Sequence, residues 1–322
     1  MRRSARAEAR GCCAMTEQEP EAGQGGEISA FESIGREIAR QIGSDCAPEP
    51  EQGVAGGGLH RCYLWRCGPT AVFVKLAGES AAAGLEAEAA GLQALAAAQA
   101  VRVPGVLALG LAQGHAFLAL EWIDTRPSNR DSARRLGERL AAQHRLTAGQ
   151  FGWPSDNAIG RTVQINGWLP DWTEFFRERR LRYQLELASR RGFGPLLEQA
   201  GERLLESVAA LLGEHRPRAS LLHGDLWGGN WFTDRQGEPV IFDPAVYYGD
   251  READLAMTRL FGGFGDAFYA AYEAQAPLAP GHAVRADLYN LYHVLNHANL
   301  FGGGYPRQAR SMIERLLAEV RG

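Results

Sequence analysis

Apolar residues follow two kinds of spacing along the chain. Between 79 and 98 they recur every three or four residues (Leu85, Ala89, Leu92, Leu95) among Ala, Glu and Gln, and this spacing predicts a helix. Shorter apolar runs predict strands, because they are too brief for a helix and turn residues flank them. The predicted strands cover 59–66, 70–76, 116–123, 220–222 and 240–242.

Helical spacing dominates the rest of the chain. One helix is predicted over 31–42, before the first strands, and the others follow residue 131. We therefore expect an α+β fold, with a small antiparallel sheet that carries one inserted helix, followed by a larger, mainly helical part. The expected divisions are a disordered extension at 1–27, a first lobe at 28–123 and a second lobe at 124–322. The later predicted helices cover 132–145, 171–189, 195–212, 251–261, 282–300 and 306–320.

Composition excludes several classes of protein. A chain of 322 residues with 45% hydrophobic content is long enough to bury two modest lobes, and its net charge of -4 offers no basic surface for nucleic acid. No apolar run approaches the roughly 20 residues that cross a bilayer. Five cysteines without a regular spacing indicate a reducing compartment, so a cytoplasmic location is expected. The N-terminal stretch has no apolar core, which argues against a secretory signal, and Met15 is an alternative start.

The segment LLHGDLWGGNW at 221–231, followed by IFDPA at 241–245, carries the strongest chemical signal. It places Asp225, Asn230 and Asp243 in the order used by kinase-like phosphotransferases. Transfer of a phosphoryl group from ATP needs a carboxylate that receives the acceptor proton and oxygen ligands that hold Mg²⁺. We expect Asp225 to be the base and Asn230 and Asp243 to be the metal ligands. A His-Gly-Asp turn also occurs for local structural reasons, but the whole constellation favours a phosphotransferase.

A kinase also needs a glycine-rich turn and a lysine upstream, and both are present in order. Gly56, Gly57 and Gly58 lie before one predicted strand, and Lys75 lies in the next. Because this turn leads into a strand, it favours a phosphate-covering hairpin over a dinucleotide-binding turn, which opens a helix. The alternative is a flexible glycine loop beside an ordinary hairpin.

An apolar strand should hold the Lys75 ammonium group against an acidic partner. Glu88 is the preferred partner and Glu86 the second candidate, on the helix predicted after the strand. A glutamate without a partner near the start of this helix would still be favoured by the helix dipole. The backbone of residues Glu121, Trp122 and Ile123 is expected to form the hinge that meets the adenine.

The chain resembles the fructosamine 3-kinase and ketosamine-3-kinase family, within the wider aminoglycoside-phosphotransferase and choline-kinase group. The shared stretches run from about residue 30 to the C-terminus, and HGDLW and DPAVYYGDREADLA are the most specific of them. The resemblance implies a two-lobed protein-kinase-like fold with the site between the lobes. It also implies ATP and Mg²⁺ as cofactors. Other stretches are VFVKL, EAEAAGLQAL, FGWPSDNAIGRTVQINGW, DWTEFFRERRL, LFGGF and LNHANLFGGGY.

The family phosphorylates the C3 hydroxyl of a ketosamine, the rearranged product of a sugar and an amine. The phosphorylated product is unstable and releases the amine, so glycated proteins are deglycated. The implied partner is therefore a small ketosamine or a glycated protein, for a monomer or weak homodimer. The open alternatives are a kinase of the same fold for an aminoglycoside, choline or a sugar, and a nucleotide-binding scaffold without catalysis.

The stretch from 151 to 168 is expected to lie over the acceptor, because long ordered loops are usually functional. Asp156 and Asn157, with Gln164 and Asn166, offer hydrogen bonds to a polyhydroxylated ligand. Trp153 offers a flat face, and so does Trp227 in the HGDLW motif. For each loop tryptophan, packing against the helical lobe is an equally good interpretation. Trp168 and Trp172 are the others.

Three further features of the sequence concern the surroundings of the predicted site. Asp250 and Asp254 flank a predicted helix start, where either suits a cap, and Asp254 matches a position that braces the catalytic loop in the wider kinase group. His293 and His297 have a spacing that suits a metal, but packing or a place on the acceptor side is favoured, and His297 is taken as a substrate-side residue. Some members of the family carry a cysteine directly after the glycine turn. That position is Leu59 here, and Cys62 lies three residues later, which argues against a redox switch through this loop.

Overall fold

The computed structural model describes residues 24–54 and 60–320, and it contains two compact units. The first unit comprises the described residues up to Ala82 together with Leu107–Trp122, and the second comprises Ala83–Val106 and the described chain from Ile123 onward. The predicted glycine turn, Gly56 to Gly58, and Leu59 lie outside the described residues, as does most of the predicted extension. The first helix, α1 (Gln24–Ile42), begins four residues before the predicted start of the first lobe.

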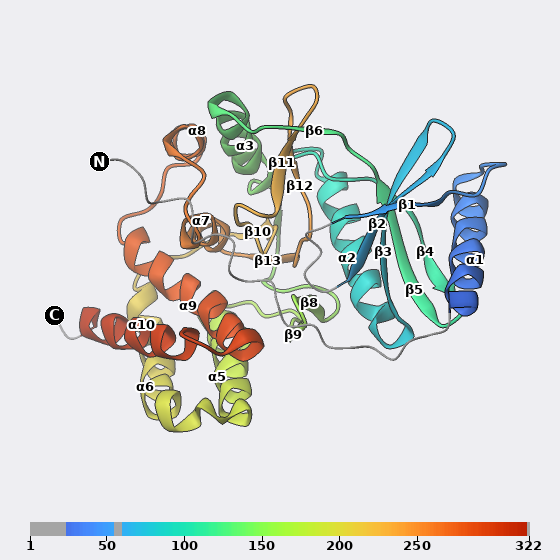
Figure 1. Cartoon of the computed structure of the whole chain (residues 1–322). Helices are drawn as coiled ribbons and strands as arrows, with labels where there is room; N and C mark the ends of the chain where they lie inside the picture. The colour runs from blue at the N-terminus through green and yellow to red at the C-terminus, as the bar shows by residue number, and fades with distance from the viewer. Residues whose placement is uncertain (1–23, 55–59, 321–322) are drawn as a thin grey trace, which may run out of the picture. The chain divides into compact units, whose positions relative to one another are not determined.

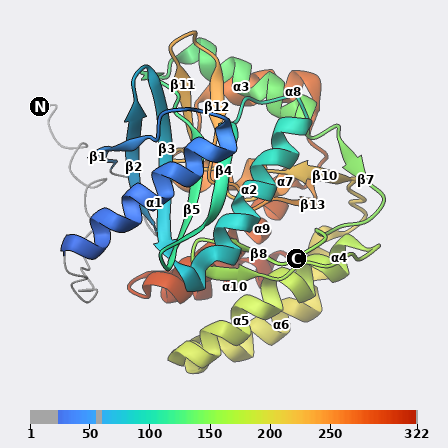
Figure 2. The same ribbon diagram turned by 90° about the vertical axis from the view of Figure 1, so that its right-hand side faces the viewer.

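The first unit is a five-stranded sheet with one helix packed on it (Figures 1 and 2). Ile34 and Ile38 of α1 are fully buried against apolar side chains of the sheet, including Val72 and Phe117. The strand order is β1-β2-β3-β5-β4. The strands are β1 (Glu49–Gly53), β2 (Arg61–Cys67), β3 (Thr70–Gly78), β4 (Val106–Ala112) and β5 (His115–Glu121).

A disulfide joins Cys46, after α1, to Cys67 at the end of β2, with 6.0 Å between their Cα atoms. The cysteine spacing gave no sign of this pair, because the antiparallel pairing of β1 with β2 brings the two residues together. The inference of a reducing compartment from unpaired cysteines therefore loses its basis. Cys62 is buried and takes no part in this disulfide.

Reduction of the Cys46–Cys67 disulfide is expected to lower the free energy of unfolding by about 3 kcal/mol, because the bond closes a loop between residues 21 positions apart. The measurement is the urea midpoint with and without a reducing agent. A Cys46→Ser variant is the control, since its midpoint should match the reduced protein and should not respond to the agent. Equal midpoints for the oxidised and reduced wild-type protein would contradict this stabilisation.

The second unit is mainly helical. Its largest core lies among the helices that follow residue 172, where Phe175, Leu204, Leu288 and Ile313 are each fully buried. Helices α5 and α6 lie side by side, and α9 packs against α7 and α10 (Figure 2). The helices are α2 (Ala82–Ala97), α3 (Arg130–Gln143), α4 (Trp172–Phe175), α5 (Tyr183–Ala188), α6 (Gly194–Leu212), α7 (Arg251–Leu260), α8 (Asp266–Gln275), α9 (His282–Phe301) and α10 (Tyr305–Glu319).

Two of these helical regions differ from the prediction. The single helix predicted over 171–189 is divided by π-helical segments, Phe176–Arg182 and Ser189–Phe193, which flank α5. The helix α8 was not predicted, because its ten residues bury only Phe268 and Tyr272 and so carry little periodic signal. A short 3-10 turn, Glu79–Ala81, precedes α2.

Small sheets complete the second unit and position its loops. One has the order β13-β10-β7 and another β12-β11-β6, while β8 and β9 form a hairpin. Most of these strands were missed in the sequence, because two to four residues are too few to show an alternating pattern. They are β6 (Thr125–Arg126), β7 (Thr147–Ala148), β8 (Asn157–Ile159), β9 (Thr162–Gln164), β10 (Ala219–Leu222), β11 (Trp231–Asp234), β12 (Pro239–Ile241) and β13 (Tyr247–Gly249).

The predicted α+β class is confirmed, with an antiparallel sheet in the first unit and mainly helices in the second. Among the described residues, no helix is both long enough and apolar enough to span a membrane.

Candidate active site

The loop at residues 223–230, here the HGD loop, leaves the end of β10 through a conformation that requires glycine. Gly224 has a φ of +83°, and a Cβ atom there would lie 2.0 Å from the carbonyl oxygen of Ala245. A side chain at this position would therefore need both a strained backbone and a displaced neighbour. The glycine lets the chain turn sharply, and Asp225 follows directly after it.

Asp254 on α7 holds this turn in place. Its carboxylate accepts hydrogen bonds from the backbone N–H groups of His223 at 2.7 Å and Gly224 at 2.8 Å. His144 donates a third hydrogen bond, at 3.2 Å. Burial acts to raise the pKa of Asp254, but its hydrogen bonds with His144 and the Gly224 N–H group oppose burial, and the net effect lowers that pKa. Asp254 therefore stays ionised and fixes the loop, as predicted for it, while Asp250 caps α7 by accepting from the Glu252 N–H.

His223 is fully buried below the same loop. Its Nε2 lies 3.0 Å from the carbonyl oxygen of Phe242, and its Nδ1 lies 3.3 Å from the backbone N–H of Asp225. The carbonyl can only accept and the N–H can only donate, so the ring carries its proton on Nε2. Burial lowers the pKa of His223, which keeps the ring neutral. His223 thus links the two segments that carry the predicted aspartates.

Asp225, Asn230 and Asp243 meet at one place. The amide nitrogen of Asn230 donates to the backbone oxygen of Asp225 at 2.8 Å, to its carboxylate at 3.3 Å and to the backbone oxygen of Asp243 at 3.5 Å. Asp243 has a φ of +55°, a conformation that non-glycine residues adopt rarely and that clusters at functional sites. The structure therefore brings together the three residues on which the sequence prediction rested.

The carboxyl group of Asp225 has an unusual pKa. Burial, with the nearby negative charge of Asp243 as the second cause, raises it to about 7, against a smaller opposing effect of the hydrogen bond from Asn230. A group with a pKa near neutrality can accept a proton during a reaction and release it afterwards. This pKa suits the predicted role of Asp225 as a general base, and that role stays a prediction.

The donor set around Asp225 suits a hard divalent cation. Because the Asn230 amide nitrogen points to Asp225 and Asp243, its amide oxygen is left for another ligand. A carboxylate and an amide oxygen are ligands that Mg²⁺ accepts, usually beside phosphate oxygens and water. Asn230 and Asp243 thus fit the metal that the sequence prediction assigned to them.

The lysine and its candidate partners lie on β3 and α2. Lys75 is 4% exposed, and its backbone pairs with Cys62 of β2 and Leu118 of β5. On α2, Glu86 is exposed and Glu88 is half-buried. Lys75 belongs to the first unit and both glutamates to the second, so an ion pair with either one would join the units. That pair stays a prediction.

The predicted hinge begins at the end of β5. Glu121 pairs with Val72 of β3, and the ring of Trp122 lies 6.5 Å from that of Phe73. Ile123 is 9% exposed and opens the second unit. A role of these three residues in adenine binding remains a prediction.

The loop at 151–168 contains a hairpin, and hydrogen bonds from its polar side chains connect it to the rest of the second unit. Asn157 donates to the Val246 carbonyl and accepts from Gln164 and Asn166, at 2.8 to 3.0 Å. The Asp156 carboxylate accepts from the backbone N–H of Asn166 at 2.7 Å. In the structure these groups hold the loop together, and their predicted contact with an acceptor stays a prediction.

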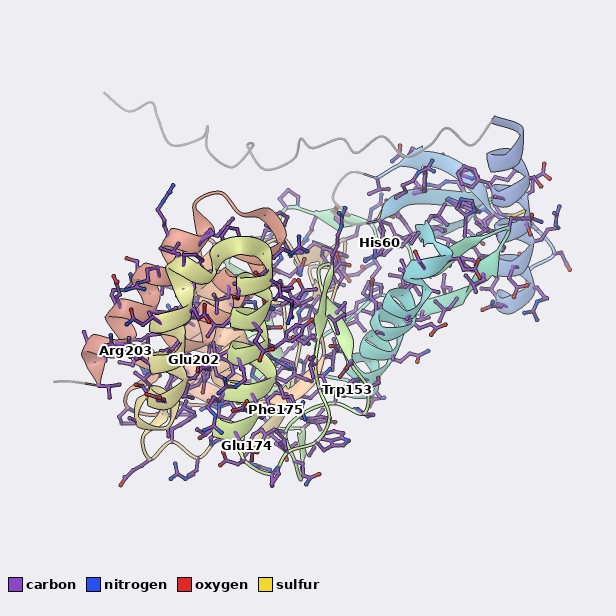
Figure 3. The ribbon with its side chains drawn as sticks, turned by 90° about the horizontal axis from the view of Figure 1, so that it is seen from below. His60, Trp153, Glu174, Phe175, Glu202 and Arg203 are labelled. Atoms are coloured by element: carbon purple, nitrogen blue, oxygen red, sulfur yellow. A yellow bond between two sulfur atoms is a disulfide. The ribbon has the colours of Figure 1, made fainter. Side chains whose placement is uncertain are left out.

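The tryptophans of this region also differ in their surroundings. Trp153 stacks on Tyr248, with 5.8 Å between ring centroids, and packs against the core that contains Phe175 (Figure 3). Trp172 is only 3% exposed, whereas Trp168 is 40% exposed. Trp153 and Trp172 thus pack against the helical core, as the alternative interpretation expects.

Exposed aromatic rings continue from the HGD loop over α7, α9 and α10. Trp227 is 38% exposed and lies edge-on to Phe261, at 6.0 Å, and Phe261 meets His297 at 5.1 Å. His297 also contacts Phe301 and Tyr305, and its buried Nδ1 has no hydrogen-bond partner among the described residues. We call these five residues the aromatic strip. It is a flat, partly apolar surface that begins inside the candidate site.

The pair at 293 and 297 does not form a metal site in the part of the chain that the structure describes. Burial lowers the pKa of His293 to about 3. Among the described residues, the cluster that could hold a metal ion lies elsewhere and consists of His215, Asp250 and Glu252. Each of these three is already engaged, because His215 contacts Asp250 at 2.7 Å and Glu252 pairs with Arg285.

Sequence reasoning missed two groups near the site. Arg180 is fully buried, lies over the rings of Phe175 and Tyr247, and donates to the Asn166 side chain at 2.8 Å. His144 connects α3 to Asp254. Neither residue stands in a recognisable chemical motif, so only their three-dimensional contacts reveal them.

Comparisons with known proteins agree with this geometry. A family model described as fructosamine kinase matches residues 30–319. A probable ketoamine kinase of Synechocystis is 46% identical over 288 residues, which is 89% of this chain and 97% of that protein. The chloroplastic protein-ribulosamine 3-kinase of Arabidopsis thaliana is 42% identical over 271 residues, with 83% and 82% of the two chains covered.

Solved structures share the fold. A Haemophilus somnus protein named as a candidate fructosamine-3-kinase superimposes with a TM-score of 0.84 at 29% identity, over 90% of this chain and 99% of that one. An aminoglycoside phosphotransferase with ADP and hygromycin B gives a TM-score of 0.56 at 16% identity, over 90% and 99% of the chains, and shows the kinase-like fold alone. The match of the family model over almost all described residues, together with these relatives, shows that the chain belongs to the fructosamine kinase family.

Proposed function

We propose that this protein is an ATP-dependent ketosamine 3-kinase. The observation that carries the proposal is the arrangement of Asp225, Asn230 and Asp243 on a loop that Asp254 fixes, with the pKa of Asp225 raised to about 7. Membership in the fructosamine kinase family and the relative named protein-ribulosamine 3-kinase support a ketosamine as the acceptor. The preferred sugar, whether ribulose, erythrulose or fructose, is left to experiment.

The reaction transfers the γ-phosphoryl group of ATP to the C3 hydroxyl. Asp225 accepts the hydroxyl proton as the C3 oxygen bonds to the γ-phosphorus, and the bond from that phosphorus to the β,γ-bridging oxygen breaks to release ADP. Positioning supplies most of the rate in such a transfer, so the contacts that fix Asp225 matter as much as its charge. In the proposal Lys75, with Glu88 as partner, positions the α- and β-phosphates of ATP, and Gly56, Gly57, Gly58 and residues 121–123 complete the nucleotide site.

Mg²⁺ is the cation proposed for Asn230 and Asp243. When bound, it would neutralise charge on the phosphates of ATP during transfer. The protein groups around it have separate tasks. The Asn230 amide nitrogen donates hydrogen bonds to the Asp225 backbone and carboxylate. Burial and the nearby negative charge of Asp243 raise the pKa of Asp225.

The aromatic strip is proposed to receive the amine-bearing part of the acceptor. Trp227 and His297 are the residues most directly placed for contact, because Trp227 lies in the HGD loop and the His297 Nδ1 has no partner among the described residues. Trp153, Asp156 and Asn157 are proposed to shape the acceptor side through the loop that they hold. The unstable 3-phosphate would then eliminate phosphate and free the amine, which is deglycation. Because the reaction needs ATP, a cytoplasmic place of action is part of the proposal.

Two other functions compete with this one. A kinase for an aminoglycoside, choline or sugar would use the same base and metal ligands, and a scaffold would bind nucleotide without turnover. The family membership disfavours the first. The complete set of Lys75, Asp225, Asn230 and Asp243 disfavours the second.

The test is ATP consumption by the purified protein with ribulosamine, fructosamine, aminoglycoside and choline acceptors, with Asp225→Asn as the blank. We expect turnover on the ketosamines, followed by release of free amine. Turnover on another acceptor alone would overturn the ketosamine assignment while leaving a kinase. Absence of turnover on all acceptors would favour the scaffold.

A further inference from the structure

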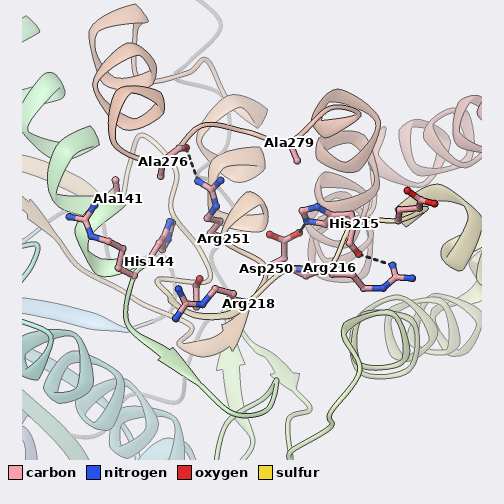
Figure 4. Close-up of a pocket in the computed structure, with 13 residues that line it drawn as sticks. Ala141, His144, His215, Arg216, Arg218, Asp250, Arg251, Ala276 and Ala279 are labelled. Carbon is pink, nitrogen blue, oxygen red and sulfur yellow. Dashed lines mark hydrogen bonds and ion pairs between the residues drawn. The ribbon is translucent and has the colours of Figure 1, made fainter.

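A cavity of about 450 Å³ lies in the second unit beneath the start of α7, lined by the end of α3, residues 214–218 and the chain around 276–279 (Figure 4). Its volume lies within the range of small-molecule sites. Four arginines line it, against two acidic residues, Glu214 and Asp250. This local excess of positive charge contrasts with the net charge of -4 for the whole chain.

The acidic residues do not cancel this charge. Asp250 is already engaged, because it accepts hydrogen bonds from His215 at 2.7 Å and from the Tyr289 hydroxyl at 2.6 Å. Glu214 is exposed and has no ion pair among the described residues. Figure 4 shows His215 and Asp250 on one side of the cavity and His144 on the other, with Arg218 and Arg251 between them.

Guanidinium groups of the lining remain available for a ligand. The side chain of Arg145 forms no hydrogen bond or ion pair with any residue in 24–54 or 60–320. Arg218 uses a single nitrogen, which donates to the Thr147 hydroxyl at 3.0 Å. Arg216 is turned to the carbonyls of Gly213 and His215 and so contributes less. Arg251 is also engaged, because it donates to the carbonyls of Ala276 and Pro277 and to the Tyr272 hydroxyl. Planar guanidinium forks match the oxygens of a phosphate group in pairs.

The cavity is connected to the HGD loop by one chain of hydrogen bonds. Arg251 donates to the Tyr272 hydroxyl at 3.1 Å, which lies 2.8 Å from Nδ1 of His144. His144 in turn meets Asp254, which holds the HGD loop. Because the Tyr272 oxygen accepts a hydrogen bond from Arg251, its O–H group is free to donate a hydrogen bond to Nδ1 of His144. A ligand that draws the Arg251 guanidinium toward itself would therefore alter a contact that reaches the loop.

We propose that this cavity binds a small phosphate monoester and that its occupancy changes the rate of phosphoryl transfer. The ligand is inferred from the chemistry of the lining: a phosphate for Arg145 and Arg218, beside the engaged Arg251, and a polar remainder of sugar size for the rest of the volume. The cavity and Asp225 lie at opposite ends of the contact chain that passes through Asp254. The cavity is therefore distinct from the nucleotide and acceptor sites.

The binding test is calorimetric titration of the whole protein with ribose 5-phosphate, with inorganic phosphate, ribose and citrate as comparisons. We expect ribose 5-phosphate to bind, inorganic phosphate to bind more weakly and ribose not to bind. Arg145→Gln and Arg218→Gln should each weaken binding by about tenfold or more, as expected when a charge-assisted hydrogen bond is lost. Arg307→Gln, which removes an exposed arginine from α10, is the matched control and should bind like the wild type.

Several results would overturn the site. They are no binding of ribose 5-phosphate by the wild type, binding by both cavity variants that is as tight as that of the wild type, or citrate binding as tight as that of ribose 5-phosphate. Loss of binding in Asp225→Asn would place the ligand at the active site instead. Because this arm measures binding only, it can fail or succeed independently of the proposed kinase activity.

The coupling test rests on the proposed function and measures turnover with and without ribose 5-phosphate. Tyr272→Phe removes the hydroxyl that links Arg251 to His144 but keeps the ring. We expect this variant to bind ribose 5-phosphate while its turnover no longer responds to it. A response of equal size in the wild type and in Tyr272→Phe, or none in the wild type, would overturn the coupling.

Discussion

Replacement of Asp225 by asparagine is expected to reduce turnover by about three orders of magnitude or more, with nucleotide affinity largely kept. The amide cannot accept the proton of the acceptor hydroxyl, so the contributions of the base and of its charge are lost together. The amide can still accept the hydrogen bond that Asn230 donates to the Asp225 side chain at 3.3 Å, so the loop should keep its shape. The measurements are single-turnover rates and ATP binding by calorimetry.

The same variant has a distinct effect on stability. The folded-state pKa of Asp225 is raised to about 7, so the wild-type fold loses stability as pH rises from the ordinary aspartate pKa of about 3.9 toward 7. Asparagine has no such loss, and Asp225→Asn should therefore unfold at a higher temperature than the wild type at pH 8. The difference should vanish below about pH 4. Turnover near the wild-type rate would contradict the base assignment, whereas a lower unfolding temperature at pH 8 would show that the substitution damages the fold.

Replacement of Asp254 by alanine is expected to lower the free energy of unfolding by about 3 to 5 kcal/mol, because the buried N–H groups of His223 and Gly224 lose their acceptor. Turnover should fall by about two orders of magnitude or more, since Asp225 would no longer be held in place. Asp254 is 1% exposed, so water cannot substitute without rearrangement. Chemical denaturation and kcat are the measurements.

Two further variants serve as comparisons for Asp254→Ala. Asp266→Ala removes an exposed carboxylate from the first turn of α8 and should cost less than about 1 kcal/mol. Asp254→Asn keeps one acceptor oxygen and should lie between alanine and the wild type in both stability and kcat. If Asp254→Ala has the stability and kcat of the Asp266→Ala control, then the hydrogen bonds to the loop do not determine its position.

Much of the chemistry of the site could be read from short spacings in the sequence. The residues from Leu221 to Trp231 and from Ile241 to Ala245 already indicated a base and two oxygen ligands, because these groups are close in the chain and their strands end nearby. The long helices were predictable too, since ten or more periodic residues average out local exceptions. The strands β7, β8 and β13 were not, because two or three residues carry no period.

The sequence by itself determined the chemical identity of the site, since Asp225, Asn230 and Asp243 depend on residue type and local order. Only the tertiary structure decided which polar groups serve the site and which serve the fold. Asn157 and Asp156 are predicted to contact a sugar, and the structure adds that their hydrogen bonds close a hairpin. The contact of His144 with Asp254 spans 110 positions, and Cys46 meets Cys67 across two strands. Such pairs depend on how elements pack, and no local pattern of residues encodes that packing.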